Sequence, residues 1–353
     1  MWPLLVAIAL ASSTLTPAYA AVASTADCPT LSEILPSTEW LRALSLDLRG
    51  TPPTDSEFDA VAQFTAPALA AIGDAEKSAS VAKSLAAELE GRIALWLGSD
   101  AFTSQAVRRH RDLLWIGLSN LRLLGVPQSL AKSGALYWRN GGNVAFYHRG
   151  NRVPCIDEPA KWDDAGNLVF TKQPDGTVRE GWVTVKPYWA PKTEIHVCAL
   201  DAQDTIVSAA GQSCSVAGAY YDASCGCGPG LRWCRYGPTE ATTLESFAQS
   251  LERQIAEVIA EDRPYTELFT DKTMWVNGPL VHFYSHQAQL CAPLRMTPTP
   301  VDPSTLPALT FDQVDTWVKI SLGKEQAGIL TAPAFLLRFQ TNRARANRFY
   351  NTF

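Results

Sequence analysis

Three cysteines within ten residues form the densest group of chemically reactive side chains in this chain. Cys225, Cys227 and Cys234 follow a C-x-C-x6-C pattern, with Cys214 or His196 as a fourth donor. Such a set of sulfur and imidazole donors could bind zinc or copper. The pattern lacks the paired C-x2-C spacing of common zinc modules. It therefore favours disulfides over a metal site or a redox-active pair.

The start of the chain supports that interpretation. Residues 1–20 contain an apolar run from Trp2 to Ala11, followed by Ala18-Tyr19-Ala20, and this pattern is typical of a cleaved signal peptide. Cysteines of exported proteins usually oxidise in pairs. Cys225 and Cys227 are too close to pair with each other without strain, so each should reach a more distant partner. We expect disulfides among all eight cysteines: Cys28, Cys155, Cys198, Cys214, Cys225, Cys227, Cys234 and Cys291.

A second candidate for chemistry is a pair of histidines, His282 and His286. Residues four apart share one face of a helix, and residues 280–290 have a helical pattern. The pair could bind a metal or haem, together with Cys225, Cys227 and Cys234, if a third ligand were supplied. No acidic residue lies four positions away on either side, so packing and surface roles are favoured and no metal site is predicted.

Two further groups could bind or process a ligand. The acidic residues Asp157, Glu158, Asp163 and Asp164 lie in a polar, turn-like stretch and could serve a secreted enzyme that acts on a polymer such as a polysaccharide. The residues Trp138, His148, Trp189 and Tyr221 could form a platform for sugar rings or for a protein partner. The alternative is that these aromatic side chains form the core of a small stapled subdomain.

Composition and missing motifs exclude several classes of function. The chain has 353 residues, 46% hydrophobic and 18% charged, with a net charge of −5. An acidic chain without basic runs is a poor candidate for nucleic-acid binding. After residue 20, no segment is long and apolar enough to span a bilayer. The motifs G-x-S-x-G, H-E-x-x-H and G-x-G-x-x-G and the Walker loop do not occur.

Helices are predicted at both ends of the chain. A capping box at Thr54–Glu57 should start a helix that ends near Phe64, and helices are expected over about 76–97 and 104–118. A second capping box at Thr242–Glu245 should start another helix. Its apolar stripe would comprise Phe247, Leu251, Ile255, Val258 and Ile259. Further helices are expected over 312–322 and 333–353.

The middle of the chain has a different pattern. Over residues 133–236, Gly, Asp, Asn and Pro are frequent, and 178–185 and 195–200 are candidate strands. The fold class is therefore mainly α: a helical body built from both ends of the chain, with a small disulfide-rich β and loop insertion. The expected parts are the signal peptide (1–20), an N-terminal helical region (21–132), the insertion (133–241) and a C-terminal helical region (242–353) that packs on the N-terminal one.

Four segments resemble a family of exported planctomycete and myxobacterial proteins of unknown function. The segment 46–54 (LDLRGTPPT) is similar to an "LDLxGxPPT" opening, and 261–269 (EDRPYTELF) to a "DRPFTELL" segment. Residues 276–284 resemble a "VNxxLAxxYG" segment. Residues 326–331, followed by Arg345 and Arg348, resemble a "GGLLT…RG" segment. The order and spacing of the four agree with the family.

The resemblance implies an exported protein associated with c-type cytochromes. Members often carry C-x-x-C-H haem attachment, which this chain lacks, so no cofactor is predicted within it and a haem c would belong to a partner or a downstream segment. The leading hypothesis is a periplasmic or secreted, non-catalytic interaction module whose partner is a c-type cytochrome or another exported protein. The alternatives are the polymer-acting enzyme and a metal- or haem-dependent electron-transfer protein.

Overall fold

The computed structural model describes residues 38–118, 121–140, 149, 152–216, 218–290 and 301–352. The chain divides into two units, residues 1–102 and 103–353. Each unit is described by itself. The predicted signal peptide, Cys28, His148 and Cys291 lie outside the described residues.

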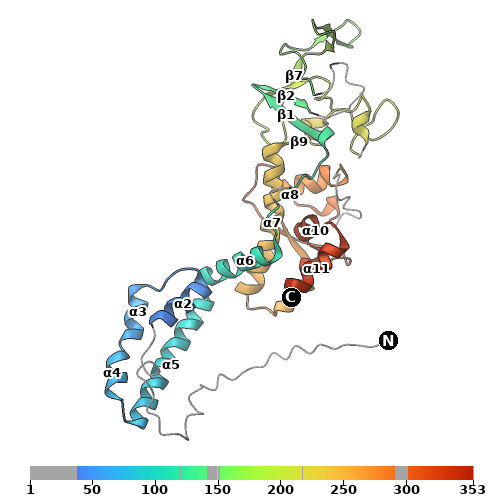
Figure 1. The fold of residues 1–353 in the computed structure, drawn as a ribbon. Coiled ribbons are helices and arrows are strands. Elements are labelled where there is room, and N and C mark those ends of the chain that lie inside the picture. The colour runs from blue at the N-terminus through green and yellow to red at the C-terminus, as the bar shows by residue number, and fades with distance from the viewer. Residues whose placement is uncertain are drawn as a thin grey trace, which may run out of the picture. The chain divides into compact units, whose positions relative to one another are not determined.

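Four helices form the described part of the first unit (Figure 1). They are α2 (Thr38–Arg49), α3 (Asp55–Ala62), α4 (Thr65–Ala70) and α5 (Ala75–Leu97). The predicted capping box is confirmed, because Thr54 caps α3 and Glu57 reaches back to the Thr54 backbone. Leu41, Val61 and Trp96 form a small core between α2, α3 and α5.

A polar network ties α2, α3 and α5 together around Glu57. Arg49 donates a bidentate pair of hydrogen bonds to Glu57, and Trp96 Nε1 donates to Glu57 Oε1 at 2.7 Å. The Arg49 guanidinium also lies 4.2 Å from the Trp96 ring centre. Burial alone would raise the pKa of Glu57, but hydrogen bonds from Arg49 and Thr54 lower it to about 2. The segment that resembles the family opening therefore forms a structural joint between helices.

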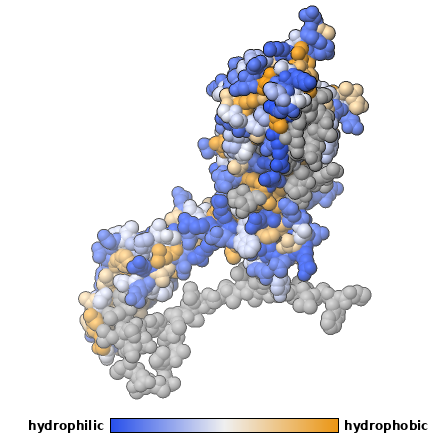
Figure 2. All heavy atoms as spheres, turned by 45° about the horizontal axis from the view of Figure 1, so that its top comes forward, coloured by the Kyte–Doolittle hydropathy of each residue, from blue (hydrophilic) through white to orange (hydrophobic). Residues whose placement is uncertain are grey.

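Several large apolar side chains remain on the surface of this unit. Hydrophobic patches interrupt its hydrophilic surface in Figure 2. The exposed side chains are Trp40, Leu46, Leu69, Ile72, Leu95 and Leu97.

The second unit has a helical core centred on one long helix. Its helices are α6 (Asp100–Leu114, which begins in the first unit), α7 (Gly237–Ala260), α8 (Gly278–His282), α9 (Gly328–Thr331), α10 (Pro333–Arg338) and α11 (Asn342–Thr352). The predicted stripe of α7 is confirmed, because Phe247, Leu251, Ile255 and Val258 are buried. Leu114 of α6 packs into the same core.

Two sequence-based expectations for this region are wrong. Helix α7 begins at Gly237, not at Thr242, and Thr242 lies inside it and donates to the Pro238 carbonyl. Residues 312–322 contain a strand, β11 (Val318–Ser321), which pairs antiparallel with β10 (Thr273–Val276). The helix expected over 333–353 is confirmed in two pieces, α10 and α11.

Between the helical segments of the chain, five strands form a mixed sheet of order β7-β8-β2-β1-β9, which Figure 1 shows beyond one end of α7. Its strands are β1 (Ser129–Ser133), β2 (Leu136–Arg139), β7 (Trp182–Val185), β8 (Ile195–Cys198) and β9 (Arg235–Tyr236). Two small hairpins join β3 (Lys161–Trp162) to β4 (Leu168–Val169) and β5 (Thr171–Lys172) to β6 (Val178–Arg179). A disulfide-rich β and loop region thus separates helical segments, as expected, and its sheet begins four residues earlier than the predicted insertion.

Short helical turns complete the described secondary structure. The 3-10 turns are η2 (Val126–Gln128), η3 (Ala219–Tyr221), η4 (Pro229–Leu231), η5 (Tyr265–Phe269), η7 (Ala288–Leu290) and η8 (Pro303–Thr305), and η6 (Phe283–Gln287) is a π-helical segment. Within the described ranges, every helix is too short or too polar to cross a membrane.

The six cysteines within the described residues form three disulfides. The pairs are Cys155–Cys198, Cys214–Cys225 and Cys227–Cys234. Cys225 and Cys227 each pair with a more distant cysteine, as predicted from the strain of a C-x-C ring. The bridge over 43 residues closes the longest of the three loops and, by chain entropy, contributes about 4 kcal/mol.

A buried ion cluster supports the sheet beside Cys198. The Arg149 guanidinium is 1% exposed and contacts the carboxylates of Glu180 and Asp201, and Arg139 Nε lies 2.9 Å from Asp201. Burial raises the pKa of Glu180. Burial opposes ionisation of Asp201 too, but Arg149 and Arg139 hold its pKa below the usual range. These charges serve the structure of the sheet, because each is paired and removed from water.

Candidate ligand-binding site

The loop closed by Cys227 and Cys234 forms one side of the candidate site. Gly228 and Gly230 adopt positive φ angles of 75° and 61°, which glycine tolerates without a Cβ clash. At Gly228 a Cβ would lie 2.5 Å from the Trp233 ring, so only glycine lets the indole pack onto the loop backbone. The disulfide and this contact fix the main chain at Arg232.

The other side of the site is a short helix that changes its winding. Asn277 caps α8, and its Nδ2 donates to the Val314 carbonyl at 2.8 Å. After His282, the chain continues as the π-helical segment 283–287. The wider turn of a π-helix brings both His286 and Gln287 beside His282. The ring centres of His282 and His286 lie 5.1 Å apart.

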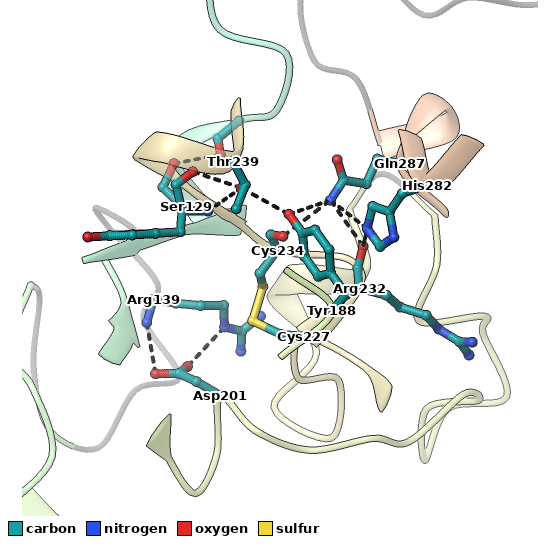
Figure 3. Close-up of a disulfide and its surroundings, with 12 residues drawn as sticks. Ser129, Arg139, Tyr188, Asp201, Cys227, Arg232, Cys234, Thr239, His282 and Gln287 are labelled. Atoms are coloured by element: carbon teal, nitrogen blue, oxygen red, sulfur yellow. Dashed lines mark hydrogen bonds and ion pairs between the residues drawn. A yellow bond between two sulfur atoms is a disulfide. The ribbon is translucent and has the colours of Figure 1, made fainter. Parts of the chain in front are cut away.

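Hydrogen bonds join the two sides (Figure 3). Gln287 Nε2 donates to the main-chain carbonyls of Arg232 at 3.1 Å and Cys234 at 3.2 Å. His282 Nε2 lies 3.2 Å from the same Arg232 carbonyl. Because a carbonyl only accepts, Nε2 carries the proton of the neutral ring. Arg232 therefore anchors the loop through its backbone carbonyl. Its side chain takes no part in these hydrogen bonds.

Stacking buries the His282 ring in this network. The Tyr188 ring lies parallel to it with a centre-to-centre distance of 3.7 Å, and His282 is 8% exposed. Burial, and then the charge of His286, lower the pKa of His282 to about 3. The ring is thus neutral at physiological pH. Burial also raises the pKa of Tyr188 to about 12, so its hydroxyl stays protonated.

An open pocket of about 280 Å³ lies beside this joint. It is lined by Ile206, Ser215, Arg232, Trp233, Tyr284, Ser285, His286, Ala288, Gln289 and Pro303. We call it the junction pocket, because the disulfide-rich region and the α8–η7 segment both line it. Burial and the nearby Arg232 charge lower the pKa of His286.

The Arg232 side chain is the charged group of the junction pocket. Its guanidinium carbon lies 5.3 Å from the Trp233 ring centre, and Figure 3 shows the side chain pointing away from Tyr188. Its Nε is buried and has no hydrogen-bond partner among the described residues. Over the same ranges, no carboxylate lines this pocket. The site thus presents a preorganised cation together with hydroxyl, imidazole and amide groups.

The predicted metal-ligating residues have different environments. His282 and His286 are neighbours, whereas Cys225, Cys227 and Cys234 form disulfides. His196 stacks on Trp182 with ring centres 3.6 Å apart. Groups of three or more histidine, cysteine or acidic side chains that could hold a metal do not occur among the described residues.

The predicted platform residues are dispersed. Trp138 packs against the core around the Cys155–Cys198 disulfide, and Trp189 packs among Tyr137, Tyr188 and Tyr236. Tyr221 is 61% exposed at the end of η3. Trp138 and Trp189 therefore take part in packing, and His148 lies outside the described residues.

The acidic residues considered for polymer hydrolysis are solvent-exposed. Asp163 Oδ1 accepts from the backbone amides of Ala165 and Asn167, so this carboxylate closes the β3–β4 turn. Asp157, Glu158 and Asp164 are exposed in the same stretch.

Sequence reasoning missed Arg232 and Gln287. The sequence signal for Arg232 was its position in a Gly/Pro-rich loop between two cysteines. A disulfide that closes such a loop restricts the backbone at Arg232. Gln287 had no signal, because its role depends on the π-helical winding after His282.

No family model matches this chain, and comparisons with curated proteins and with solved structures also give no match. The chemistry of the junction pocket is therefore the basis for a function of this protein.

Proposed function

We propose that this protein is a periplasmic or secreted binding module whose ligand occupies the junction pocket. The hypothesis of a non-catalytic module in a cytochrome-associated system agrees with this role. In such a system a c-type cytochrome or another exported protein would be the macromolecular partner, and any haem c would be held by that partner or by a downstream segment.

One observation carries the proposal: a cationic side chain lines an open pocket whose walls are fixed in advance. The Cys227–Cys234 loop and the α8–η7 segment are joined by Gln287 and His282 through main-chain carbonyls. A site that is already ordered loses little conformational entropy when a ligand binds. About 280 Å³ is enough for a small polar ligand or for the end group of a larger one.

A pocket-filling variant tests the proposal. Ser285 lines the pocket and is exposed, so Ser285→Trp should fold and occupy the space. We expect a panel of small anionic, neutral and cationic compounds to contain members that stabilise the native protein in thermal unfolding but do not stabilise S285W. Equal stabilisation of both proteins by every binder, or by none, would contradict a ligand site here.

The electron-transfer alternative has one observation in its favour, the 5.1 Å separation of the His282 and His286 rings. Metal binding there would need the Nδ1 atom of His282 or the loss of its Nε2 contact with Arg232. Titration with Cu²⁺ or Zn²⁺, compared between the native protein and His286→Asn, tests this candidate. Stoichiometric binding that the substitution removes would favour it over the binding module.

A further inference from the structure

We propose that the junction pocket selects an oxyanion, the carboxylate, sulfate or phosphate group of a small ligand, and that Arg232 is its main contact. This inference rests on the proposed function and names the class of ligand.

The charge of Arg232 is not neutralised by the described part of the chain. Four other arginines of the disulfide-rich region are paired: Arg139 with Asp201, Arg149 with Glu180, Arg179 with Asp175 and Arg235 with Glu240. Arg152, in the same region, is exposed to solvent and does not line the pocket. Arg232 contacts no carboxylate among the described residues, and its buried Nε has no acceptor. The nearest acid along the chain from the lining residue Pro303 is Asp302, and its carboxylate accepts from the amide and hydroxyl of Ser304.

The guanidinium is also held in place before a ligand arrives. The Trp233 ring supports it at 5.3 Å, and Trp233 is itself fixed against Gly228. A guanidinium offers a planar fork of N–H donors that matches a carboxylate or phosphate group in a bidentate manner. An acceptor bound here would also satisfy the buried Nε, which now lacks a partner.

The remaining polar groups of the pocket complement an anion. Ser285 supplies a hydroxyl donor, Gln289 supplies an amide, and the neutral His286 ring supplies an N–H. Ser215 adds a second hydroxyl, which also shares a hydrogen bond with Ser213 Oγ at 2.8 Å. A bound anion has several oxygen atoms that each accept hydrogen bonds, so one arginine and two or more neutral donors form a sufficient set. A cationic ligand would instead be repelled by Arg232 in a partly desolvated site.

Isothermal titration with chosen anions tests the inference. The titrants are sodium sulfate, sodium phosphate, sodium acetate, sodium galacturonate and neutral galactose, at constant ionic strength set with sodium chloride. We expect saturable binding of at least one oxyanion with one site per chain and no binding of galactose. Comparison of sulfate and phosphate with the two carboxylates decides which anion the pocket prefers.

Two arginine variants provide the decisive comparison. Arg232→Gln keeps the backbone carbonyl that accepts from His282 and Gln287, so the fold should persist. Arg253→Gln is the matched control, because Arg253 also lies over a tryptophan, Trp317, at 4.5 Å, and it does not line the pocket. We expect R232Q to weaken anion binding about ten- to a hundredfold and R253Q to leave it unchanged.

The outcomes separate this inference from the proposed function. If R232Q binds anions as tightly as the native protein, or if no anion binds, the inference is wrong. If neutral compounds bind the native protein but not S285W, while anions do not bind, the ligand site stands and only the anion selectivity is wrong. If nothing distinguishes S285W from the native protein, both are wrong.

Discussion

The neutral state of His282 predicts that the second unit loses stability in mild acid. The ring is stacked on Tyr188 and donates to the Arg232 carbonyl, and its pKa in the folded protein is about 3 against 6.5 in an unfolded chain. Between these two values the unfolded state binds a proton that the folded state excludes. Stability is therefore complete above pH 6.5 and falls as the pH drops towards 3.

The magnitude follows from the same two values. One pKa unit corresponds to about 1.4 kcal/mol, so at pH 5 the depressed pKa of His282 should cost about 2 kcal/mol relative to pH 7.5. The full shift would cost about 5 kcal/mol once the pH is below the folded pKa. No discount for solvent screening applies to a ring that is 8% exposed.

Urea unfolding followed by tryptophan fluorescence, between pH 5 and pH 7.5, measures this effect. His282→Phe keeps an aromatic ring against Tyr188 and removes the proton site, so the native protein should lose about 2 kcal/mol more than H282F at pH 5. Tyr188→Phe is the control, because it retains both the stack and the buried histidine. The same pH dependence in the native protein and H282F would show that His282 does not have a strongly lowered pKa in the folded protein.

Three further outcomes test the structural argument. Arg149→Ala should cost about 4 kcal/mol in urea unfolding, because it leaves Glu180 and Asp201 buried without their shared cation; a loss below about 1 kcal/mol, typical of a surface pair, would contradict this. Gly278→Ala should lower the unfolding midpoint strongly, since a Cβ there would meet the Thr310 carbonyl oxygen at 1.9 Å, and an unchanged midpoint would speak against that contact. The unreduced intact mass should lie about 6 Da below the all-thiol value for the three disulfides, and about 8 Da below it if Cys28 and Cys291 also pair; a smaller difference would show that a described disulfide is not formed.

Patterns that act over a few residues were sufficient for much of the helical structure. The Thr54–Glu57 capping box depends on contacts across one turn, and the stripe on α7 reports a buried face directly. The prediction that Cys225 and Cys227 pair with more distant cysteines also depended only on local geometry. Which cysteine each one reaches depends on the folded loop, and the sequence left that open.

Strand β11 shows where local reasoning stops. Residues 312–322 contain apolar side chains at spacings that fit a short helix, but Val318 and Ile320 alternate with Lys319 and Ser321 as in a strand. Residues 318–321 form a strand because β10, more than forty residues earlier in the chain, supplies their hydrogen-bond partners. A strand pairing between residues so far apart in the chain cannot be predicted from a short stretch of sequence.

The segments that resemble an exported family occupy positions with strict packing demands. Glu57, which follows the first segment, joins three helices, and Gly278 and Gly328 leave no space for a Cβ. Asn277 caps α8 and contacts Ser246. The packing of the fold therefore explains these residue types without any appeal to a common ancestor. The third of these segments, 276–284, also reaches the junction pocket, because Tyr284 lines it.

The candidate site was only half visible in the sequence. His282 and His286 stood out by their spacing, but the π-helical segment gives His282 a buried structural role and leaves His286 at the pocket. Arg232 could not be selected from the sequence, because what distinguishes it is that no described carboxylate contacts its side chain. Only the structure shows which carboxylates lie near an arginine. A sequence lists charges, whereas the fold decides which of them are paired.

The most direct measurement is a ¹H–¹⁵N spectrum of the arginine Nε–H groups and backbone amides, recorded during titration with the tightest-binding anion. We expect saturable shifts of the Arg232 Nε–H and of the Ser285 and His286 amides, with the Arg253 Nε–H unchanged. Shifts that are absent at Arg232, or equal at Arg232 and Arg253, would contradict anion binding at Arg232 in the junction pocket.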